Sequence, residues 1–509
     1  MPRRPYHGGV DLLHACPGAR LIGGVPEIQA VTHDSRQVHA GSAFVAVPGA
    51  VTDGHDYIGG AIEAGSRLVV VQADHEQKWA QYADRAALLV VEDSRQAMGP
   101  VAAEVYGHPS HEMLLAGVTG TDGKTTTCHL AGHLLSQCGI ACGYLTSAGF
   151  DTGNGFEPNA LHMTTLEATH VQGLLARATR SGRQAMCVEA SSEGLAQHRL
   201  AGCELDVAVF RNLSRDHLDF HGSMEAYRDA KGALFEMLET DHAKPFPKAA
   251  IVNADDPVSA HMLRRTSTRA ITYGIESEAD VRGLDVAVSG LRVEFSVSAG
   301  GEVARARASL MIPYNALAVI AVALSQGLSL AAAAAALETF PGVPGRFEVI
   351  DCGQPFLVVV DIASTPAALE FVLKTLRPAT AGKLWVVFGA AGGRDTARRD
   401  GMGRVAARLA DCAVLTNEDP RHEDPDAIIE TIAAAMRDAG RREGSDFVRV
   451  PDRLEAIRHA FEHARPGDTV LLAGKATETF MVFGESRVAW DERSVARELL
   501  AAGGAAGTR

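Results

Sequence analysis

The chain has 509 residues, of which 46% are hydrophobic and 22% charged, and its formal net charge is −14. This composition is typical of soluble globular proteins and excludes an extended basic surface for nucleic acid, while the length predicts about three domains. The eight cysteines include no C-x-x-C pair, and no window approaches the roughly 18 apolar residues of a membrane span, so we expect a reduced, cytoplasmic protein without such a span.

Residues 1–110 alternate short apolar runs with turns, and two of these runs predict buried strands, at 68–71 and 87–91. His108-Pro109-Ser110 then predicts a hinge. From there to residue 343 the pattern of strand, glycine-rich turn and helix repeats. We expect a helix at 125–138 and strands at 113–118, 185–188, 207–210 and 249–252.

The Gly/Pro-rich stretch 341–345 predicts a second domain boundary. Beyond it the same alternation returns, with strands expected at 356–360, 384–388, 413–415 and 469–473. We therefore predict an α/β protein of three domains, 1–110, 111–343 and 344–509, with mainly parallel sheets in the second and third.

Residues 117–125 read Gly-Val-Thr-Gly-Thr-Asp-Gly-Lys-Thr and lie between a predicted strand and a predicted helix. This is the setting of a phosphate-binding loop, because glycines let the backbone approach phosphates and the helix N-terminus adds favourable partial charge. Lys124 is expected to reach the β- and γ-phosphates, and Thr125 to offer its hydroxyl to Mg²⁺. The motif predicts binding of ATP or GTP and leaves the acceptor open.

Polar residues follow two of the predicted strands. Glu189 ends one of them, where a carboxylate could coordinate a second cation or serve only as a cap or salt-bridge partner. Residues 212–219 read Asn-Leu-Ser-Arg-Asp-His-Leu-Asp and predict a short turn, either a solvated loop or a place where His217 joins Glu189 at a metal. Lys231 lies in an amphipathic helical segment, 226–235, where a lone lysine is usually a surface charge.

Together these stretches resemble the Mur ligases, and most closely the MurE type, which adds the third residue of the peptidoglycan stem peptide. The likeness continues nearly end to end, through Asp34-Ser-Arg36, Gly345-Arg346-Phe-Glu348, Asp419-Pro-Arg421 and Gly474-Lys475. It implies an N-terminal uridine-nucleotide-binding α/β domain, a central P-loop ATPase domain and a C-terminal Rossmann-like domain that binds an amino acid.

The resemblance also implies roles for matching positions. The residues that would contact ATP are Gly117, Thr119, Gly120, Thr121, Asp122, Gly123, Lys124, Thr125, Thr126, Asn315, Arg346 and Asp361. Those that would hold the UDP-muramoyl dipeptide are Ser35, Thr164, Thr165, Ser191, Gln197 and Arg199, and those that would hold the incoming amino acid are Arg394, Asp419, Arg421, Gly474 and Glu478. Lys124, Glu189, His217 and Lys231 would form the catalytic centre. Lys231 would be carbamylated by CO₂, and this anion would hold Mg²⁺ with Thr125, Glu189 and His217.

The chain departs from the family pattern at several positions. Asp122 replaces an Asn in the phosphate loop, and Arg211 replaces a Thr. Ser364 and Thr477 stand where His is usual in the third domain. Because departures concentrate in that domain, the choice of amino acid is the least determined part of the prediction.

The family pattern Asn-Pro-Arg, associated with meso-diaminopimelate, is Asp419-Pro420-Arg421 here. Arg421 could pair with the distal carboxylate of diaminopimelate, whereas Asp419 would favour a plain ammonium, as on L-lysine or L-ornithine. We expect meso-diaminopimelate to be added to UDP-N-acetylmuramoyl-L-alanyl-D-glutamate through an acyl phosphate in peptidoglycan precursor synthesis, with lysine and ornithine as alternatives.

Two rival functions remain. Another ligase of the superfamily, such as a folylpolyglutamate synthetase, is disfavoured by the Asp34-Ser-Arg36 region, which points to a uridine nucleotide. A non-catalytic nucleotide-binding scaffold would explain the departures but not the presence of Lys124, Glu189, His217 and Lys231 together. We expect a monomer whose partners are small molecules.

Overall fold

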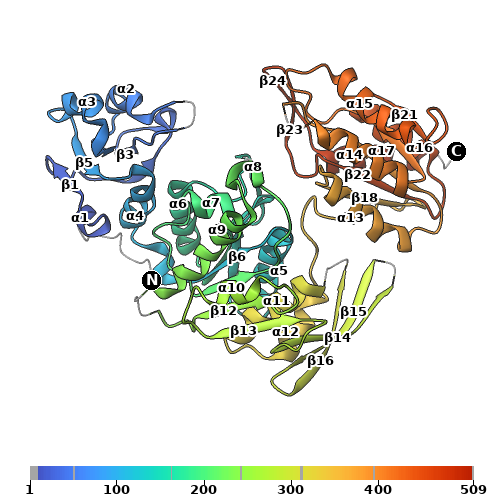
Figure 1. The fold of residues 1–509 in the computed structure, drawn as a ribbon, viewed down its shortest axis with the longest axis horizontal. Helices are drawn as coiled ribbons and strands as arrows, with labels where there is room; N and C mark the ends of the chain where they lie inside the picture. Colours follow the sequence, from blue (N-terminus) through green and yellow to red (C-terminus); the bar gives the residue numbers. More distant parts are fainter. Residues whose placement is uncertain are drawn as a thin grey trace. The chain divides into compact units, whose positions relative to one another are not determined.

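The computed structural model describes residues 10–49, 52–161, 163–240, 244–289, 291–309, 313–393 and 396–506. The chain forms two compact units, with nearly all residues up to Phe340 in the first and those from Pro341 in the second (Figure 1). Within the described residues, no helix combines the length and apolar character needed to cross a membrane.

The first domain of the first unit is a five-stranded sheet in the order β1-β5-β4-β3-β2, parallel except at β1. One face packs on Leu12 and Met98, and the other on Ile58 and Trp79. Its elements are α1 (Leu12–Ala15), β1 (Arg20–Ile22), β2 (Ala30–Thr32), η1 (Ser35–Gln37), β3 (Ser42–Val45), η2 (Gly54–Tyr57), α2 (Ile58–Glu63), β4 (Leu68–Gln72), η3 (Ala73–His75), α3 (Glu76–Trp79), η4 (Ala80–Tyr82), β5 (Ala87–Val91), α4 (Ser94–Val105) and η5 (Pro109–Glu112).

The central domain is built on an eleven-stranded sheet in the order β16-β15-β14-β13-β12-β11-β6-β10-β7-β8-β9. Its strands are β6 (Leu114–Thr119), β7 (Cys142–Leu145), β8 (Gly149–Asp151), β9 (Glu157–Pro158), β10 (Ala185–Glu189), β11 (Val207–Phe210), β12 (Ala249–Asn253), β13 (Ala270–Gly274), β14 (Val281–Ser289), β15 (Arg292–Ala299) and β16 (Glu302–Ser309). Its helices are α5 (Lys124–Gln137), α6 (Ala168–Arg180), α7 (Ser192–Ala196), α8 (Leu218–His221), α9 (Met224–Glu236), η6 (Met237–Glu239), α10 (Ser259–Leu263), α11 (Pro313–Ser325) and α12 (Leu330–Leu337).

The middle of this sheet is parallel from β7 to β14. Strands β6, β10, β11 and β12 are buried at every position, as expected for parallel strands covered on both faces. Because β11, β6 and β10 are neighbours, the segments that follow them meet at one edge of the sheet. The four strands predicted here are confirmed to within one residue, but the predicted turn at 212–219 runs into helix α8.

The second unit holds a six-stranded sheet in the order β17-β18-β22-β19-β20-β21, parallel except at β17, and a separate β23-β24 hairpin. Helices α13, α14 and α15 cover one face of the sheet, and α16 and α17 the other. The elements are β17 (Glu348–Ile350), β18 (Leu357–Asp361), α13 (Pro366–Leu376), η7 (Arg377–Ala379), β19 (Leu384–Phe388), α14 (Ala397–Leu409), β20 (Cys412–Leu415), α15 (Pro425–Asp438), β21 (Phe447–Arg449), α16 (Arg453–His463), β22 (Thr469–Ala473), β23 (Phe480–Phe483), β24 (Ser486–Ala489) and α17 (Glu492–Ala506). The predicted α/β fold with mainly parallel sheets is confirmed.

Candidate active site

The phosphate loop joins β6 to α5 and is braced from the next strand. Gly120 and Gly123 have φ values of 152° and 83°, which favour glycine. The backbone N–H groups of Thr121 and Asp122 donate to the side-chain oxygen of Asn212, at 3.1 and 2.9 Å. Asn212, which follows β11, therefore fixes the loop, so that α5 begins with Lys124 directly behind it.

Two lysine side chains converge on the loop backbone. The Nζ of Lys124 donates to the carbonyl oxygens of Gly120 and Thr121, at 3.1 and 2.8 Å. The Nζ of Lys231, on α9, donates to the same Gly120 oxygen at 2.8 Å and lies 4.4 Å from the ring centre of Tyr227. Lys231 is 1% exposed, so the general expectation of a surface charge for a lone helical lysine is wrong at this position.

Burial lowers the pKa of Lys231 well below its ordinary value, and the positive charge of Lys124 lowers it further. An uncharged amine is the form of lysine that adds to CO₂. The environment of Lys231 therefore suits the carbamate that the resemblance implies, and the amine is in direct contact with the phosphate loop at Gly120.

Glu189 and Thr125 meet at Ser147. The Oε2 atom of Glu189 accepts from the Ser147 N–H at 3.3 Å, and the hydroxyls of Thr125 and Ser147 hydrogen-bond at 3.1 Å. Glu189 is 1% exposed. A buried carboxylate beside two hydroxyls offers the hard oxygen atoms that Mg²⁺ prefers, so these residues fit the ion. Ser147 was not predicted from the sequence, because it follows the short strand β7 and belongs to no recognisable motif.

His217 lies at the start of α8 with a φ of 51°. Its side chain is 53% exposed, and its Nε2 atom lies 3.4 Å from a carboxylate oxygen of Asp216. Its ring centre is 6.0 Å from that of Tyr227, whose hydroxyl hydrogen-bonds Thr121 of the phosphate loop. His217 is thus near the loop, and its place at a metal stays a prediction.

Four of the residues predicted to hold the dipeptide form one network at the end of β10. The Thr165 hydroxyl donates to the carbonyl oxygen of Glu189 at 2.8 Å and hydrogen-bonds the Ser191 hydroxyl at 3.0 Å. Arg199 donates to the Thr165 carbonyl at 3.0 Å and to the Gln197 side chain at 2.8 Å. These groups border the metal-binding candidates through Glu189.

The other two predicted dipeptide residues lie apart from that network. Thr164 is half-buried beside Thr165. Ser35 begins η1 in the N-terminal domain, where Asp34 accepts from the Arg36 backbone N–H at 3.0 Å and pairs with its guanidinium at 2.8 Å. The Asp34-Ser-Arg36 motif is therefore a capped turn that presents Ser35.

A cavity of about 350 Å³ adjoins the phosphate loop in the first unit. It is lined by Asp122, Gly123, Arg211, Asn212, Asn253, Asp255, Asp256, Pro257, Glu276 and Tyr314. Asn315, predicted near the nucleotide, is 2% exposed and its side-chain oxygen lies 3.4 Å from the Thr127 hydroxyl on α5. Most residues that line this cavity were not predicted from the sequence, because they come from separate loops after β11, β12 and β13.

In the second unit, Lys475 binds two of the residues that are predicted to hold the incoming amino acid. Its Nζ donates to Asp419 at 2.8 Å and also to Glu478, and its side chain is fully buried. Asp419 is therefore already paired with a protein ammonium, which it shares with Glu478. Arg421 has a φ of 54°, and its guanidinium has no hydrogen bond or ion pair with any residue that the structure describes. Arg394, which is also predicted to hold the incoming amino acid, lies outside the described residues.

Glu418, which the sequence did not single out, lies behind Gly474. Gly474 has a φ of 107°, and a Cβ there would stand 2.9 Å from the Oε2 atom of Glu418. Burial raises the pKa of Glu418 to about 7, and within the described chain Oε2 has no hydrogen-bond partner.

Arg346 and Asp361, predicted near the adenine nucleotide, also belong to this unit. The Asp361 carboxylate accepts from the N–H groups of Phe347 and Ala363, both at 2.8 Å. Burial raises the pKa of Asp361, and the charge of Arg346 opposes that rise.

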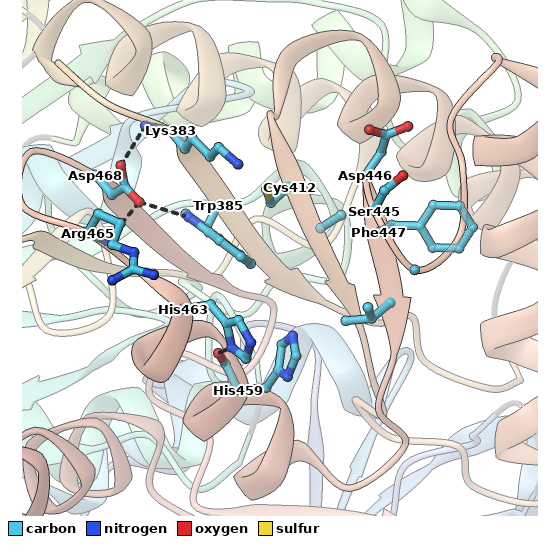
Figure 2. A pocket seen from close by; sticks show the side chains of 13 residues that line it. Lys383, Trp385, Cys412, Ser445, Asp446, Phe447, His459, His463, Arg465 and Asp468 are labelled. Carbon is cyan, nitrogen blue, oxygen red and sulfur yellow. Dashed lines mark hydrogen bonds between the residues drawn. The ribbon is translucent and has the colours of Figure 1, made fainter.

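A second cavity, of about 410 Å³, opens at the opposite, amino-terminal edge of the C-terminal sheet. Figure 2 shows Lys383, Trp385, Arg465 and the stacked imidazoles of His459 and His463 around it. The carboxylate of Asp468 there accepts from Lys383 N–H, Trp385 Nε1–H and Arg465 N–H. None of the predicted site residues lines this cavity.

Asp53, His55 and His75 form the one group of three or more acidic, His or Cys side chains with metal-like spacing in the described chain. His55 is not available as a ligand, because its Nδ1 bonds Asp53 at 2.7 Å and its Nε2 accepts from the Gln72 N–H at 2.9 Å. Lys78 pairs with the other Asp53 oxygen at 2.8 Å. This cluster is a structural hydrogen-bond network.

The chain is similar to known proteins along most of its length. Models described as "Mur ligase family, catalytic domain", "Mur ligase middle domain" and "Mur ligase, glutamate ligase domain" match residues 27–106, 118–323 and 345–476. A UDP-N-acetylmuramyl-tripeptide synthetase of Roseiflexus sp. (strain RS-1) is 43% identical over 501 residues, covering 96% of this chain and 98% of its own.

Two further proteins carry the name UDP-N-acetylmuramoyl-L-alanyl-D-glutamate--2,6-diaminopimelate ligase. One, from Geobacillus thermodenitrificans (strain NG80-2), is 40% identical over 490 residues, covering 96% of this chain and 98% of its own. The other is a solved structure that aligns with a TM-score of 0.63 at 31% identity, over 94% of this chain and 95% of that one.

Proposed function

This chain belongs to the Mur ligase family and is an ATP-dependent, ADP-forming ligase, and from that premise we propose that it joins meso-diaminopimelate to UDP-N-acetylmuramoyl-L-alanyl-D-glutamate. The observation that carries the proposal is the convergence of Lys124 and Lys231 on the Gly120 carbonyl, with Glu189 and Thr125 joined through Ser147. This arrangement supports a site in which two lysines, a buried carboxylate and two hydroxyls surround one phosphate loop.

The chemistry has two steps. A carboxylate oxygen of the dipeptide attacks the γ-phosphorus of ATP, the bond to the β-phosphate oxygen breaks, and ADP leaves. The neutral amine of the incoming amino acid then attacks the acyl carbon, phosphate leaves, and the nitrogen loses a proton as the amide forms. Positioning and charge stabilisation dominate phosphoryl transfer, and Lys124 supplies a fixed positive charge for it.

Mg²⁺ would be held by Thr125 and Glu189, with His217 and carbamylated Lys231 as further ligands, and it would neutralise charge on the transferring phosphoryl group. Thr165, Ser191, Gln197 and Arg199 would orient the dipeptide at the end of β10. Arg346 and Asp361 would serve the adenine nucleotide. We place the reaction in the cytoplasm and expect a monomer.

Diaminopimelate is favoured over lysine and ornithine by the charges in the second unit. Asp419, the residue that would attract a plain side-chain ammonium, is already paired with Lys475. Arg421 has no acidic partner among the described residues and suits a distal carboxylate. The name of the Geobacillus relative supports the same choice.

The test is phosphate release with ATP, Mg²⁺ and the UDP-muramoyl dipeptide, with diaminopimelate, L-lysine or L-ornithine added in turn. Release together with a new nucleotide tripeptide only when diaminopimelate is present is the expected result. Equal turnover of all three amino acids contradicts the acceptor choice. ATP binding without release under any condition contradicts the ligase reaction and leaves the scaffold function.

A further inference from the structure

The N-terminus of α5 combines a phosphate loop with an unusual neighbour, Arg211. The first N–H groups of any helix lack partners within the helix, and they attract anions. Here Gly123 is the cap residue of α5 and lines the 350 Å³ cavity of the first unit together with Arg211. Arg211 stands where the family pattern has a threonine.

The side chain of Arg211 is buried but largely unpartnered. It is 2% exposed. Its Nη1 donates to the hydroxyl of Tyr273 at 3.4 Å, and this is the one hydrogen bond of its guanidinium to the described chain. The Nε atom is fully buried without a partner. Nη2 makes no hydrogen bond to the residues that the structure describes.

The free edge of this guanidinium faces the start of α5. A Cβ at Gly123 would stand 2.7 Å from Nη2 and 3.0 Å from Nε of Arg211. The backbone holds the side chain in this direction, because the Arg211 N–H donates to Thr119 at 2.9 Å and its carbonyl accepts from Asn253 at 3.0 Å. Two N–H groups are thus presented side by side at the helix N-terminus.

No described carboxylate forms an ion pair with Arg211, although Asp122, Asp255, Asp256 and Glu276 line the same cavity. Asp255 accepts from the N–H groups of Ile275, Glu276 and Ser277, and Asp256 accepts from Leu213 and Val258. A buried charge without a partner is costly, so its retention calls for an anion in the bound state. Paired Arg N–H groups match two oxygen positions of a phosphate.

We propose that Arg211 is a nucleotide-binding residue, which donates from Nε and Nη2 to phosphate oxygens of the adenine nucleotide at the N-terminus of α5. This inference rests on the proposed ATP-dependent function and adds to it a phosphate contact that the family pattern, with threonine at this position, does not provide. Threonine is neutral and too short to present two donors there.

The experiment measures binding of Mg-ADP to the full-length chain by calorimetry, for the wild type, Arg211→Thr, and Arg264→Thr as a control that removes the same charge from an exposed position. Loss of charge-assisted hydrogen bonds predicts about 10- to 100-fold weaker ADP binding by Arg211→Thr. Arg264→Thr keeps wild-type affinity. Arg211→Lys, a second variant, keeps the charge without the paired donors. Its ADP affinity is expected to lie between those of the wild type and Arg211→Thr.

Thermal unfolding separates a binding role from a structural one. Without nucleotide, Arg211→Thr unfolds at a temperature no lower than the wild type, because an unpaired buried charge has been removed. With ADP its melting temperature rises less than that of the wild type. Wild-type ADP affinity in Arg211→Thr, or a lower melting temperature with an unchanged ADP-induced rise, overturns this inference alone. Failure of the wild type itself to bind ADP overturns the proposed function as well.

Discussion

The side-chain amine of Lys231 donates to the carbonyl oxygen of Gly120 across 2.8 Å, although 111 residues separate them in the chain. The contact holds an otherwise costly buried amine against the loop that is expected to carry ATP. Burial at this place and the positive charge of Lys124 lower the pKa of Lys231.

Lys231→Arg is expected to lower ligase activity by about 100-fold or more, because arginine keeps a positive charge but cannot form the carbamate that would help to hold Mg²⁺. Phosphate release with saturating substrates measures the effect. In CO₂-depleted buffer the wild type should lose activity and regain it when bicarbonate is added, whereas the variant should not respond. Full activity in Lys231→Arg would rule out a carbamate at this position.

Gly123→Ala is expected to abolish nucleotide binding. Its φ of 83° strains any other residue, and the new Cβ would stand 2.7 Å from Arg211 Nη2 and 2.8 Å from the Asn315 side chain. Gly155→Ala is the matched control, since Gly155 has a φ of 87° with no atom within 4 Å of the new Cβ. Both substitutions cost roughly 1–3 kcal/mol of backbone strain, but only the first should lose ADP binding.

Arg421→Ala is expected to reduce kcat/KM for diaminopimelate by about 10- to 100-fold, with a much smaller effect on any residual use of L-lysine. Diaminopimelate has a distal carboxylate for the guanidinium, and lysine does not. Steady-state kinetics with both amino acids measure the two effects, and Arg458→Ala, at a half-exposed position of α16 that pairs with Glu455, is the control. An equal loss of kcat/KM for both amino acids would show that Arg421 does not bind the distal carboxylate.

Glu418 makes the stability of the second unit depend on pH. Its folded pKa of about 7 lies above the ordinary value of 4.5, so the folded state holds the proton more tightly. The resulting stabilisation is fully present below about pH 4.5 and is lost as the pH rises through about 7. In Glu418→Gln this dependence disappears, and the difference amounts to roughly 3 kcal/mol at most.

Urea unfolding at pH 5 and pH 8 tests this prediction. The chain has three tryptophans, Trp79, Trp385 and Trp490, so in a Trp79→Phe background the fluorescence reports on the second unit alone. Between pH 5 and pH 8, the free energy of unfolding of the protein with Glu418 should fall relative to that of Glu418→Gln. The control Glu462→Gln should leave the pH dependence of the wild type unchanged. A pH-independent difference would mean that Glu418 is ionised in the folded protein at both values.

The sequence by itself determined the α/β class, the main parallel strands and the phosphate loop. These features are local: a run of apolar residues predicts a buried strand, and glycines before a lysine at a helix start predict the loop geometry. The strands at 185–188 and 207–210 were predicted for this reason. The strands β14, β15 and β16, at the β16 end of the sheet, were not predicted, because they contain no long continuous apolar run.

Only the tertiary structure decided how the charged residues of the site are partnered. Lys231 is buried, Thr125 and Glu189 are joined by Ser147, Asp419 is paired with Lys475, and Arg211 is turned toward α5. Each depends on groups that come from separate strands or loops. Protonation, charge pairing and burial are set by the atoms that surround a side chain in space, which neighbours along the chain do not specify.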